Sequence, residues 1–134
     1  MDQAHPQKMA GLLVLVVEDE PMLLMTYEDA LSDAGARWLS ASSVNEALGL
    51  LTDDVDVAIL DIRLGDEKVF PVAHDLLARG IPFLFCSGTA GDMADGLFSE
   101  ILLIHKPANA GMVVDKALSI ARQAAGLQEP DAAS

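Results

Sequence analysis

The sequence predicts a doubly wound α/β fold, in which helices cover both faces of a parallel β-sheet. Short apolar runs alternate along the chain with segments that have the pattern of helices. Each run is continuous, which is typical of parallel strands that are buried on both faces. Strands that alternate with helices favour right-handed βαβ units, and hence one parallel sheet. We expect strands at about 12–17, 56–61, 81–86 and 101–104, and a second strand with a weaker pattern at about 37–41.

The connections between these strands carry recognisable helix ends. Pro21 suits the first turn of a helix, where its missing N–H is not needed, and Gly35 is a typical C-terminal stop. Ser43 begins a capping-box pattern with Glu46, three residues further on. The remaining elements are a loop at 63–67, a helix ending near Arg79 and Gly80, a poorly patterned segment at 88–98 and a final helix at about 109–125.

The length of the chain, 134 residues, is that of one domain, and about half of its residues are hydrophobic. Such a chain can bury a sizeable core and is too hydrophobic to be disordered. The first ten residues and the last nine have no usable periodicity. The sequence therefore predicts a flexible leader at 1–10, one domain at 11–125 and a flexible tail at 126–134.

The formal net charge of −13, from 21 acidic and 8 basic residues, excludes some functions. Nucleic-acid binding needs basic patches, and here the basic residues are few and scattered. No apolar stretch is long enough for a membrane helix, and the N-terminus lacks the pattern of a secretory signal. Cys86 is the one cysteine and cannot form an internal disulfide, so we expect a reducing, cytoplasmic setting.

Side chains that can bind a ligand or take part in a reaction lie where the apolar runs end. Glu18 and Asp19 follow the first run, Asp61 closes the third, Ser87 closes the fourth and Lys106 follows the fifth. In open α/β sheets ligands bind just beyond the carboxyl ends of the strands, so these residues should meet at one edge. Carboxylates suit Mg²⁺, and a lysine can pair with a phosphoryl oxygen. We therefore expect a site for a metal ion and a phosphoryl group.

Each of these residues also has a simpler interpretation. Glu18 and Asp19 could be two solvated acids that stabilise the N-terminus of the next helix. Asp61 could be a metal ligand, a nucleophile that forms an aspartyl phosphate, or a simple strand stop. Ser87 could be a turn residue, and a lysine in a loop is usually a solvated charge. Their joint placement favours the functional interpretation.

Four motifs, in their order and spacing, resemble the receiver domain (CheY-like) of bacterial two-component response regulators. The motifs are VLVVEDEP at 14–21, ILD at 59–61, FCSG at 85–88 and KP at 106–107. The resemblance covers about residues 11–125 and implies a flavodoxin-like (βα)5 fold with the strand order 2-1-3-4-5. The FCSG run is also similar to a subgroup of receivers with a Phe-Ala-Thr-Gly-x-Tyr run, although Ala90 replaces its tyrosine.

By this resemblance, the residues at the strand ends bind Mg²⁺ and accept a phosphoryl group. Asp61 would be the phosphoacceptor. Asp19, Asp61 and the backbone carbonyl of Arg63 would bind the metal directly, and Glu18 would act through metal-bound water. Lys106 would hold a phosphoryl oxygen.

The resemblance also implies a switch and residues that tune it. Ser87 would move to bond the phosphate on activation. Arg63 and Thr89, two residues beyond Asp61 and Ser87, would tune the lifetime of the phosphorylated state.

Three positions depart from the usual receiver pattern. Receivers often carry Pro four residues after the phosphoacceptor and Gly a few residues further, where this chain has Gly65 and Val69. Many carry an aromatic switch residue three positions before the lysine, and here that switch position is Leu103. Ser87 must then signal in some other way.

Enzyme interpretations fit the sequence poorly. A flavin-binding module needs an anion-binding loop after the first strand, where residues 18–20 would repel a phosphate. A dinucleotide fold needs a Gly-x-Gly-x-x-Gly turn, which is absent there. A phosphatase with an aspartyl nucleophile typically has a second acid where this chain has Arg63.

The sequence therefore predicts a signalling phosphoacceptor rather than an enzyme. It would take a phosphoryl group from a histidine kinase or a phosphotransfer protein onto Asp61, by self-catalysed transfer with slow autodephosphorylation. It would act by protein–protein contact, with residues 90–125 as the docking face. The alternative left open is a degenerate receiver that binds partners without being phosphorylated.

Overall fold

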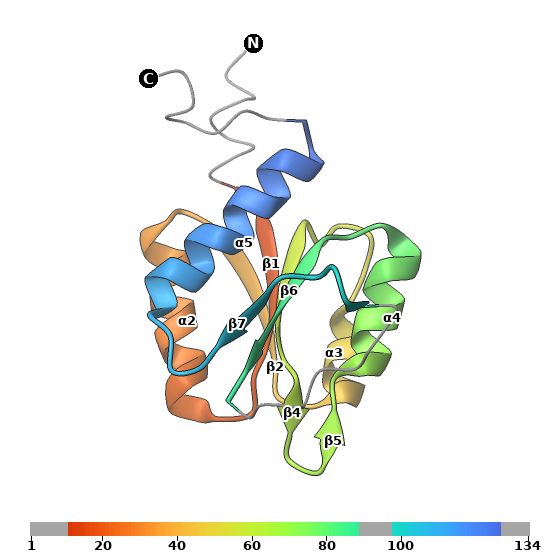
Figure 1. The fold of residues 1–134 in the computed structure, drawn as a ribbon. Helices are drawn as coiled ribbons and strands as arrows, with labels where there is room; N and C mark the ends of the chain where they lie inside the picture. Colours follow the sequence, from red (N-terminus) through yellow and green to blue (C-terminus); the bar gives the residue numbers. More distant parts are fainter. Residues whose placement is uncertain (1–10, 89–97, 127–134) are drawn as a thin grey trace.

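The computed structural model describes residues 11–88 and 98–126, and it contains one five-stranded parallel sheet (Figure 1). The strand order is β2-β1-β3-β6-β7, and each neighbouring pair is parallel. Numbered by these five strands alone, this is the 2-1-3-4-5 order, so the predicted fold class is confirmed. The strands are β1 (Leu13–Val17), β2 (Arg37–Ala41), β3 (Val57–Asp61), β6 (Phe83–Ser87) and β7 (Leu103–His105).

Helices cover both faces of the sheet, as Figure 1 shows. On one face α2 packs against α5, and on the other α3 packs against α4. The helices are α2 (Pro21–Asp33), α3 (Val44–Leu50), α4 (Phe70–Arg79) and α5 (Ala110–Ala124).

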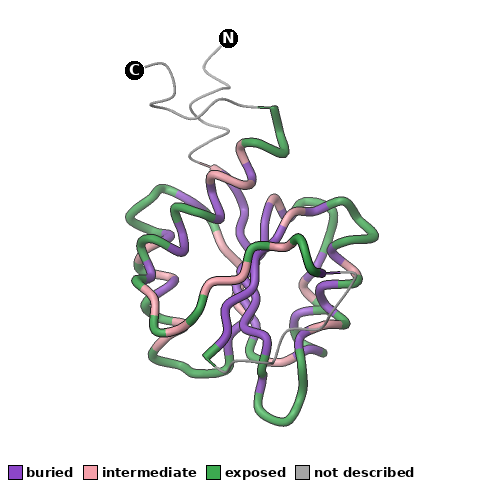
Figure 2. Tube along the Cα trace, in the orientation of Figure 1, coloured by how far each residue is buried: buried purple, intermediate pink, exposed green. Residues whose placement is uncertain are grey.

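The two layers of helices enclose two hydrophobic cores, one on each face of the sheet. Alternate residues of β1 serve the two cores, since Leu13 and Leu15 face the α3–α4 side while Val14 and Val16 face the α2–α5 side. The three central strands, β1, β3 and β6, are accordingly buried along their length (Figure 2). This two-sided burial explains why the apolar runs are continuous rather than alternating.

The helix ends predicted from Pro21, Gly35 and Ser43 are present. Gly35 has a φ of 79° and ends α2 in a Schellman motif, in which the Ala36 N–H donates to the Leu31 carbonyl at 3.0 Å. The Ser43 hydroxyl caps α3 by accepting from the Glu46 N–H at 3.1 Å. In a capping box the Glu46 carboxylate would also accept from the Ser43 N–H. Here it accepts from the Ser42 N–H instead, at 2.7 Å.

The segment expected as a loop at 63–67 forms a small antiparallel hairpin instead. Its strands are β4 (Arg63–Leu64) and β5 (Glu67–Lys68). Gly65 begins the turn with a φ of 61°, a left-handed conformation that glycine adopts without strain. The hairpin stands at the edge of the sheet where β3 ends (Figure 1).

Several predicted segments lie wholly or partly outside the described residues. They are the leader at 1–10, the tail beyond residue 126 and most of the poorly patterned segment, residues 89–97. In the part of the chain that the structure does describe, no helix is both long and apolar enough to cross a bilayer.

Replacing the cap of α3 should lower the stability of the fold. We expect Ser43→Ala to reduce the free energy of unfolding by about 1 kcal/mol, because the Glu46 N–H loses its acceptor. Ser32→Ala, at an exposed position inside α2, should leave the stability unchanged or raise it slightly. Urea unfolding of both variants measures the difference; equal values would contradict the capping role.

Candidate functional site

The carboxyl ends of four strands meet at the edge of the sheet that carries the β4–β5 hairpin (Figure 1). Asp61 is the last residue of β3, and Ser87 is the last residue of β6. Glu18 directly follows β1, and Lys106 directly follows β7. Because parallel strands run in one direction, residues far apart in the sequence come together here.

Three carboxylates gather at this edge. Glu18, Asp19 and Asp61 each place one carboxylate oxygen within 4.8 Å of the others. Glu18 is 2% exposed and Asp61 is 7% exposed, whereas Asp19 is exposed to solvent. We refer to these three residues as the acidic cluster.

Lys106 bridges the two buried members of the acidic cluster. Its Nζ lies 3.1 Å from Glu18 Oε1 and 3.2 Å from Asp61 Oδ2. Its backbone N–H donates to the Ser87 carbonyl at 2.8 Å, so the pairing of β7 with β6 fixes where the side chain begins. The following peptide bond, Lys106–Pro107, is cis.

Backbone N–H groups hold the two acids that follow β1. The Glu20 N–H donates to Glu18 Oε2 at 3.2 Å. The Gly65 N–H, from the hairpin after β3, donates to Asp19 Oδ2 at 2.9 Å. The neighbouring acids Glu18 and Asp19 can therefore both approach Asp61, although in an extended strand they would point to opposite faces.

The electrostatics of the acidic cluster follow from burial. Burial and the nearby Asp61 carboxylate raise the pKa of Glu18 from 4.5 to about 7, although Lys106 opposes the shift. Burial also raises the pKa of Asp61, again against the effect of Lys106. Burial alone would lower the pKa of Lys106, but the two carboxylates outweigh it and raise that pKa.

The donor set fits a divalent cation. With all groups ionised, the described residues at this site set three carboxylates against one ammonium, which is an excess of two negative charges at a partly buried site. Clustered carboxylate oxygens are what Mg²⁺ prefers, and it completes its shell with water. The exposure of Asp19 leaves room for such waters on one side.

Of four further residues named from the sequence, the structure describes three. Ser87 is buried at the end of β6, and Arg63 is exposed in β4, two residues beyond Asp61. Leu103 is half-buried in β7, in register with Phe85. Thr89 lies outside the described residues.

Two contacts of the site were not predicted from the sequence. One is the bond from the Gly65 N–H to Asp19. Receivers often have proline at this position, which has no N–H, so the glycine in this sequence could have indicated the extra bond. The other lies behind the site, where the hydroxyl of buried Tyr27 donates to Cys86 Sγ at 3.6 Å. Burial raises the pKa of the Cys86 thiol to about 11, so it is an inert part of the core.

Solved structures of known proteins share this architecture. The solution structure of SdrG from Sphingomonas melonis Fr1 matches with 38% identity and a TM-score of 0.69, over 84% of this chain and 97% of that chain. A receiver protein from Sinorhizobium medicae WSM419 matches with 21% identity and a TM-score of 0.73, over 85% and 97%. No model of a protein family matches the chain, and no curated protein does either.

A doubly wound sheet with an acidic cluster and a bridging lysine at its carboxyl edge defines the class of this protein as a receiver-type α/β domain. At the identity and coverage found for SdrG, the relationship extends beyond the fold. The chain belongs to the family of response regulator receiver (CheY-like) domains.

Substitutions at Gly65 should test both the positive φ of this residue and its hydrogen bond to Asp19. A Cβ at residue 65 would meet no atom within 4 Å, so only the positive φ penalises Gly65→Ala, by about 1 kcal/mol. Gly65→Pro removes the N–H that holds Asp19 and also cannot adopt the positive φ, because the proline ring fixes φ at about −65°, so it should cost at least about 2 kcal/mol. Gly65→Asn, which tolerates this φ, is the control and should cost least. Urea unfolding tests the order; a proline variant as stable as the asparagine variant would contradict it.

The stabilising effect of Mg²⁺ should grow with pH. Because the pKa of Glu18 is raised to about 7 in the folded protein, the folded state binds more protons than the unfolded chain between pH 4.5 and about 7. Without a cation, stability therefore falls as the pH rises through this interval. Mg²⁺ requires ionised carboxylates, so it should raise the melting temperature by roughly 5 °C or more near pH 8 and by much less near pH 5.5.

Thermal unfolding with MgCl₂, against KCl at equal ionic strength, measures this effect. The potassium control removes simple screening of the net charge of −13. A magnesium effect that is the same at both pH values, or no larger than that of potassium, would contradict a carboxylate site.

Proposed function

We propose that the protein is the phosphoacceptor receiver of a two-component phosphorelay and that Asp61 accepts the phosphoryl group from a histidine kinase or a phosphotransfer protein. The observation that carries this proposal is the position of Asp61. Its carboxylate lies at the end of a buried strand, between two other carboxylates and a lysine. The receiver family of the chain supports the same role.

The transfer needs a nucleophile and groups that stabilise the negative charge of the phosphoryl oxygens. A carboxylate oxygen of Asp61 would attack the phosphorus of a phosphohistidine. The new P–O bond would form as the P–N bond breaks, and the imidazole would leave and take up a proton. Lys106 already stands 3.2 Å from Asp61 Oδ2 and would pair with a phosphoryl oxygen, so this chain supplies the electrostatics itself. We therefore propose a self-catalysed signalling phosphoacceptor with slow autodephosphorylation.

Mg²⁺ is the metal we propose for the acidic cluster. Asp19, Asp61 and the carbonyl of Arg63 would bind it directly, and Glu18 would act through a bound water. The ion would neutralise the charge of the cluster and screen the incoming phosphoryl oxygens. The excess negative charge of the described residues around Lys106 supports this assignment.

A relative supports the idea of an activated state. SdrG has a BeF₃-activated conformation, and this chain is similar to it with 39% identity and a TM-score of 0.64, over 81% of this chain and 93% of that chain. We propose that this chain takes up the same phosphoryl analogue at Asp61. Ser87 would then move to bond the phosphate, and Arg63 and Thr89 would tune the lifetime of the modified state.

The output of the modified protein is proposed to be protein contact. Residues 90–125 form the face expected to dock a target, although residues 90–97 lie outside the described residues. Leu103, at the usual switch position, packs against the α3–α4 core and offers neither a ring nor a hydroxyl. The proposed signal therefore depends on Ser87 rather than on an aromatic residue of β7.

Asp61→Asn should abolish phosphorylation while the protein stays folded. Incubated with acetyl phosphate and Mg²⁺, the native chain should gain the mass of one phosphoryl group. The variant should gain none, because an amide oxygen is not a nucleophile for this transfer. Asp66→Asn, at an exposed position of the β4–β5 hairpin that follows Asp61, is the matched control and should be phosphorylated normally. Intact-mass spectrometry measures all three proteins.

Two outcomes would count against the proposal. A native chain that takes up neither a phosphoryl group nor BeF₃ with Mg²⁺ would favour the degenerate receiver. A phosphorylated Asp61→Asn variant would place the acceptor elsewhere.

A further inference from the structure

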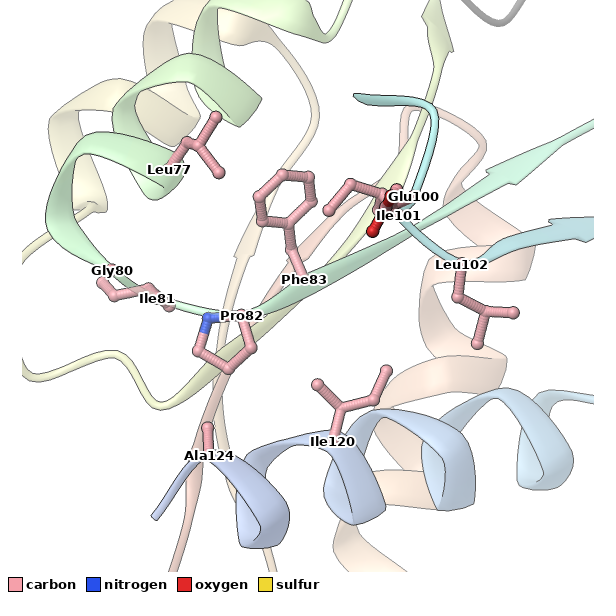
Figure 3. Close-up of a pocket in the computed structure, with 10 residues that line it drawn as sticks. All are labelled: Leu77, Gly80, Ile81, Pro82, Phe83, Glu100, Ile101, Leu102, Ile120 and Ala124. Carbon is pink, nitrogen blue, oxygen red and sulfur yellow. The ribbon is translucent and has the colours of Figure 1, made fainter. Parts of the chain in front are cut away.

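An apolar groove lies at the end of the sheet away from the acidic cluster. It has a volume of about 520 Å³ and is bounded by α4 on one side and α5 on the other (Figure 3). Leu77 of α4 and Phe83 of β6 lie on one side of the chain segment that leads into β6, and Ile120 of α5 lies on the other. We refer to this feature as the α4–α5 groove.

The α4–α5 groove and the acidic cluster lie at opposite ends of the same strands. Phe83, which lines the groove, begins β6, and Ser87 at the acidic cluster ends it. A strand of this length spans roughly 13 Å. Leu102, which also lines the groove, directly precedes β7, while Lys106 directly follows β7. A ligand in the groove would therefore leave the phosphoacceptor accessible.

Two large apolar side chains at the rim of the groove are exposed to solvent. Leu77 is 40% exposed and Leu102 is 41% exposed, and both are among the exposed large hydrophobic side chains of the structure. Leu102 points across the groove toward α5 (Figure 3). Exposed aliphatic side chains on the two sides of one hollow are typical of interaction sites.

The charge of the groove is negative. Of the described residues that line it, Glu100 alone carries a charge, and this residue is exposed. A smaller hollow of about 240 Å³ adjoins it, and four of the described residues line both, namely Gly80, Ile81, Pro82 and Ala124. The basic residue there, Arg79, is already paired with Asp53 at 2.7 Å and with Asp75 at 3.0 Å. The groove therefore offers a carboxylate to a cationic ligand and no uncompensated cation to an acidic one.

We propose that the α4–α5 groove binds an amphipathic helix of a partner protein, with aliphatic side chains on one face and a flanking lysine or arginine. The aliphatic side chains would cover the exposed Leu77 and Leu102, and the cation would pair with Glu100. A small molecule fits less well, because pockets for small molecules usually bury most of the ligand's surface. This groove is instead open along two exposed leucines. A groove bounded by two helices and rimmed by exposed aliphatic side chains suits a helical segment, which presents side chains at i, i+3, i+4 and i+7.

Glu100, Leu102 and Ile120 belong to the docking face at 90–125, so this inference rests on that part of the proposed function. Binding to the groove needs no phosphoryl transfer to Asp61, so the two proposals can fail separately.

A designed peptide tests the proposal. The probe is a fluorescein-labelled helical peptide of roughly fifteen residues, with leucines at i, i+4 and i+7 and a lysine at each end. Its partner probe carries glutamate in place of each lysine. By fluorescence anisotropy, the lysine peptide should bind the native chain roughly tenfold more tightly than the glutamate peptide, because Glu100 attracts one and repels the other.

Matched variants separate the groove from the overall acidity of the chain. Glu100→Lys should weaken binding of the lysine peptide roughly five- to tenfold. Asp33→Lys makes the same charge change at an exposed position of α2 and should alter binding less than twofold. Leu102→Asn should weaken binding roughly tenfold, whereas Met25→Asn, at a 60% exposed position of α2, should not weaken it.

Three results would overturn the proposal. They are no binding of either peptide, equal effects of Glu100→Lys and Asp33→Lys, or equal effects of Leu102→Asn and Met25→Asn. Analytical ultracentrifugation adds a fourth. A native dimer that Leu102→Asn converts to a monomer would assign the groove to a second copy of this chain instead.

Discussion

The bridge that Lys106 forms between Glu18 and Asp61 is the interaction on which the site depends. Two carboxylates that are almost completely buried repel each other and lose hydration, which is costly unless a cation compensates for both. The ammonium lies 3.1 Å from one and 3.2 Å from the other, so a single residue serves both. Removing that charge would leave a cluster of like charges at the edge of the core. Lys106 therefore reduces the cost of burying the Asp61 carboxylate and favours its ionised form, which is the nucleophile.

The bridge in turn depends on the direction of the strands. Glu18, Asp61 and Lys106 follow or end three different strands, and only a parallel sheet brings those ends to one edge. The backbone bond from Lys106 to the Ser87 carbonyl fixes the last of these strands against β6. Two hydrophobic cores hold the sheet between its helices, so the edge is rigid where the charges meet. The buried apolar runs are thus the structural cause of the site.

The sequence predicted the fold and the strand ends because both follow from patterns within short segments. Continuous apolar runs identified the strands, and the residues after them, such as Asp61 and Lys106, marked the edge. The hairpin at 63–68 and the bond from Gly65 to Asp19 depend instead on backbone geometry between distant segments. No local pattern contains that geometry. For the same reason, the sequence could not predict that the Glu46 carboxylate accepts from the Ser42 N–H rather than from the Ser43 N–H.

The two ends of β6 carry different chemistry, and this division limits how the protein can work. At one end, charged groups around Asp61 exclude apolar ligands, and at the other, the α4–α5 groove offers apolar surface with one carboxylate. A phosphoryl donor and a helical partner would therefore not compete for the same atoms. Between the two ends, the rings of Phe83 and Phe85 pack edge to face at 5.5 Å. Both β6 and β7 run from the groove to the acidic cluster, so an influence of one end on the other can pass along either strand and the side chains packed on it.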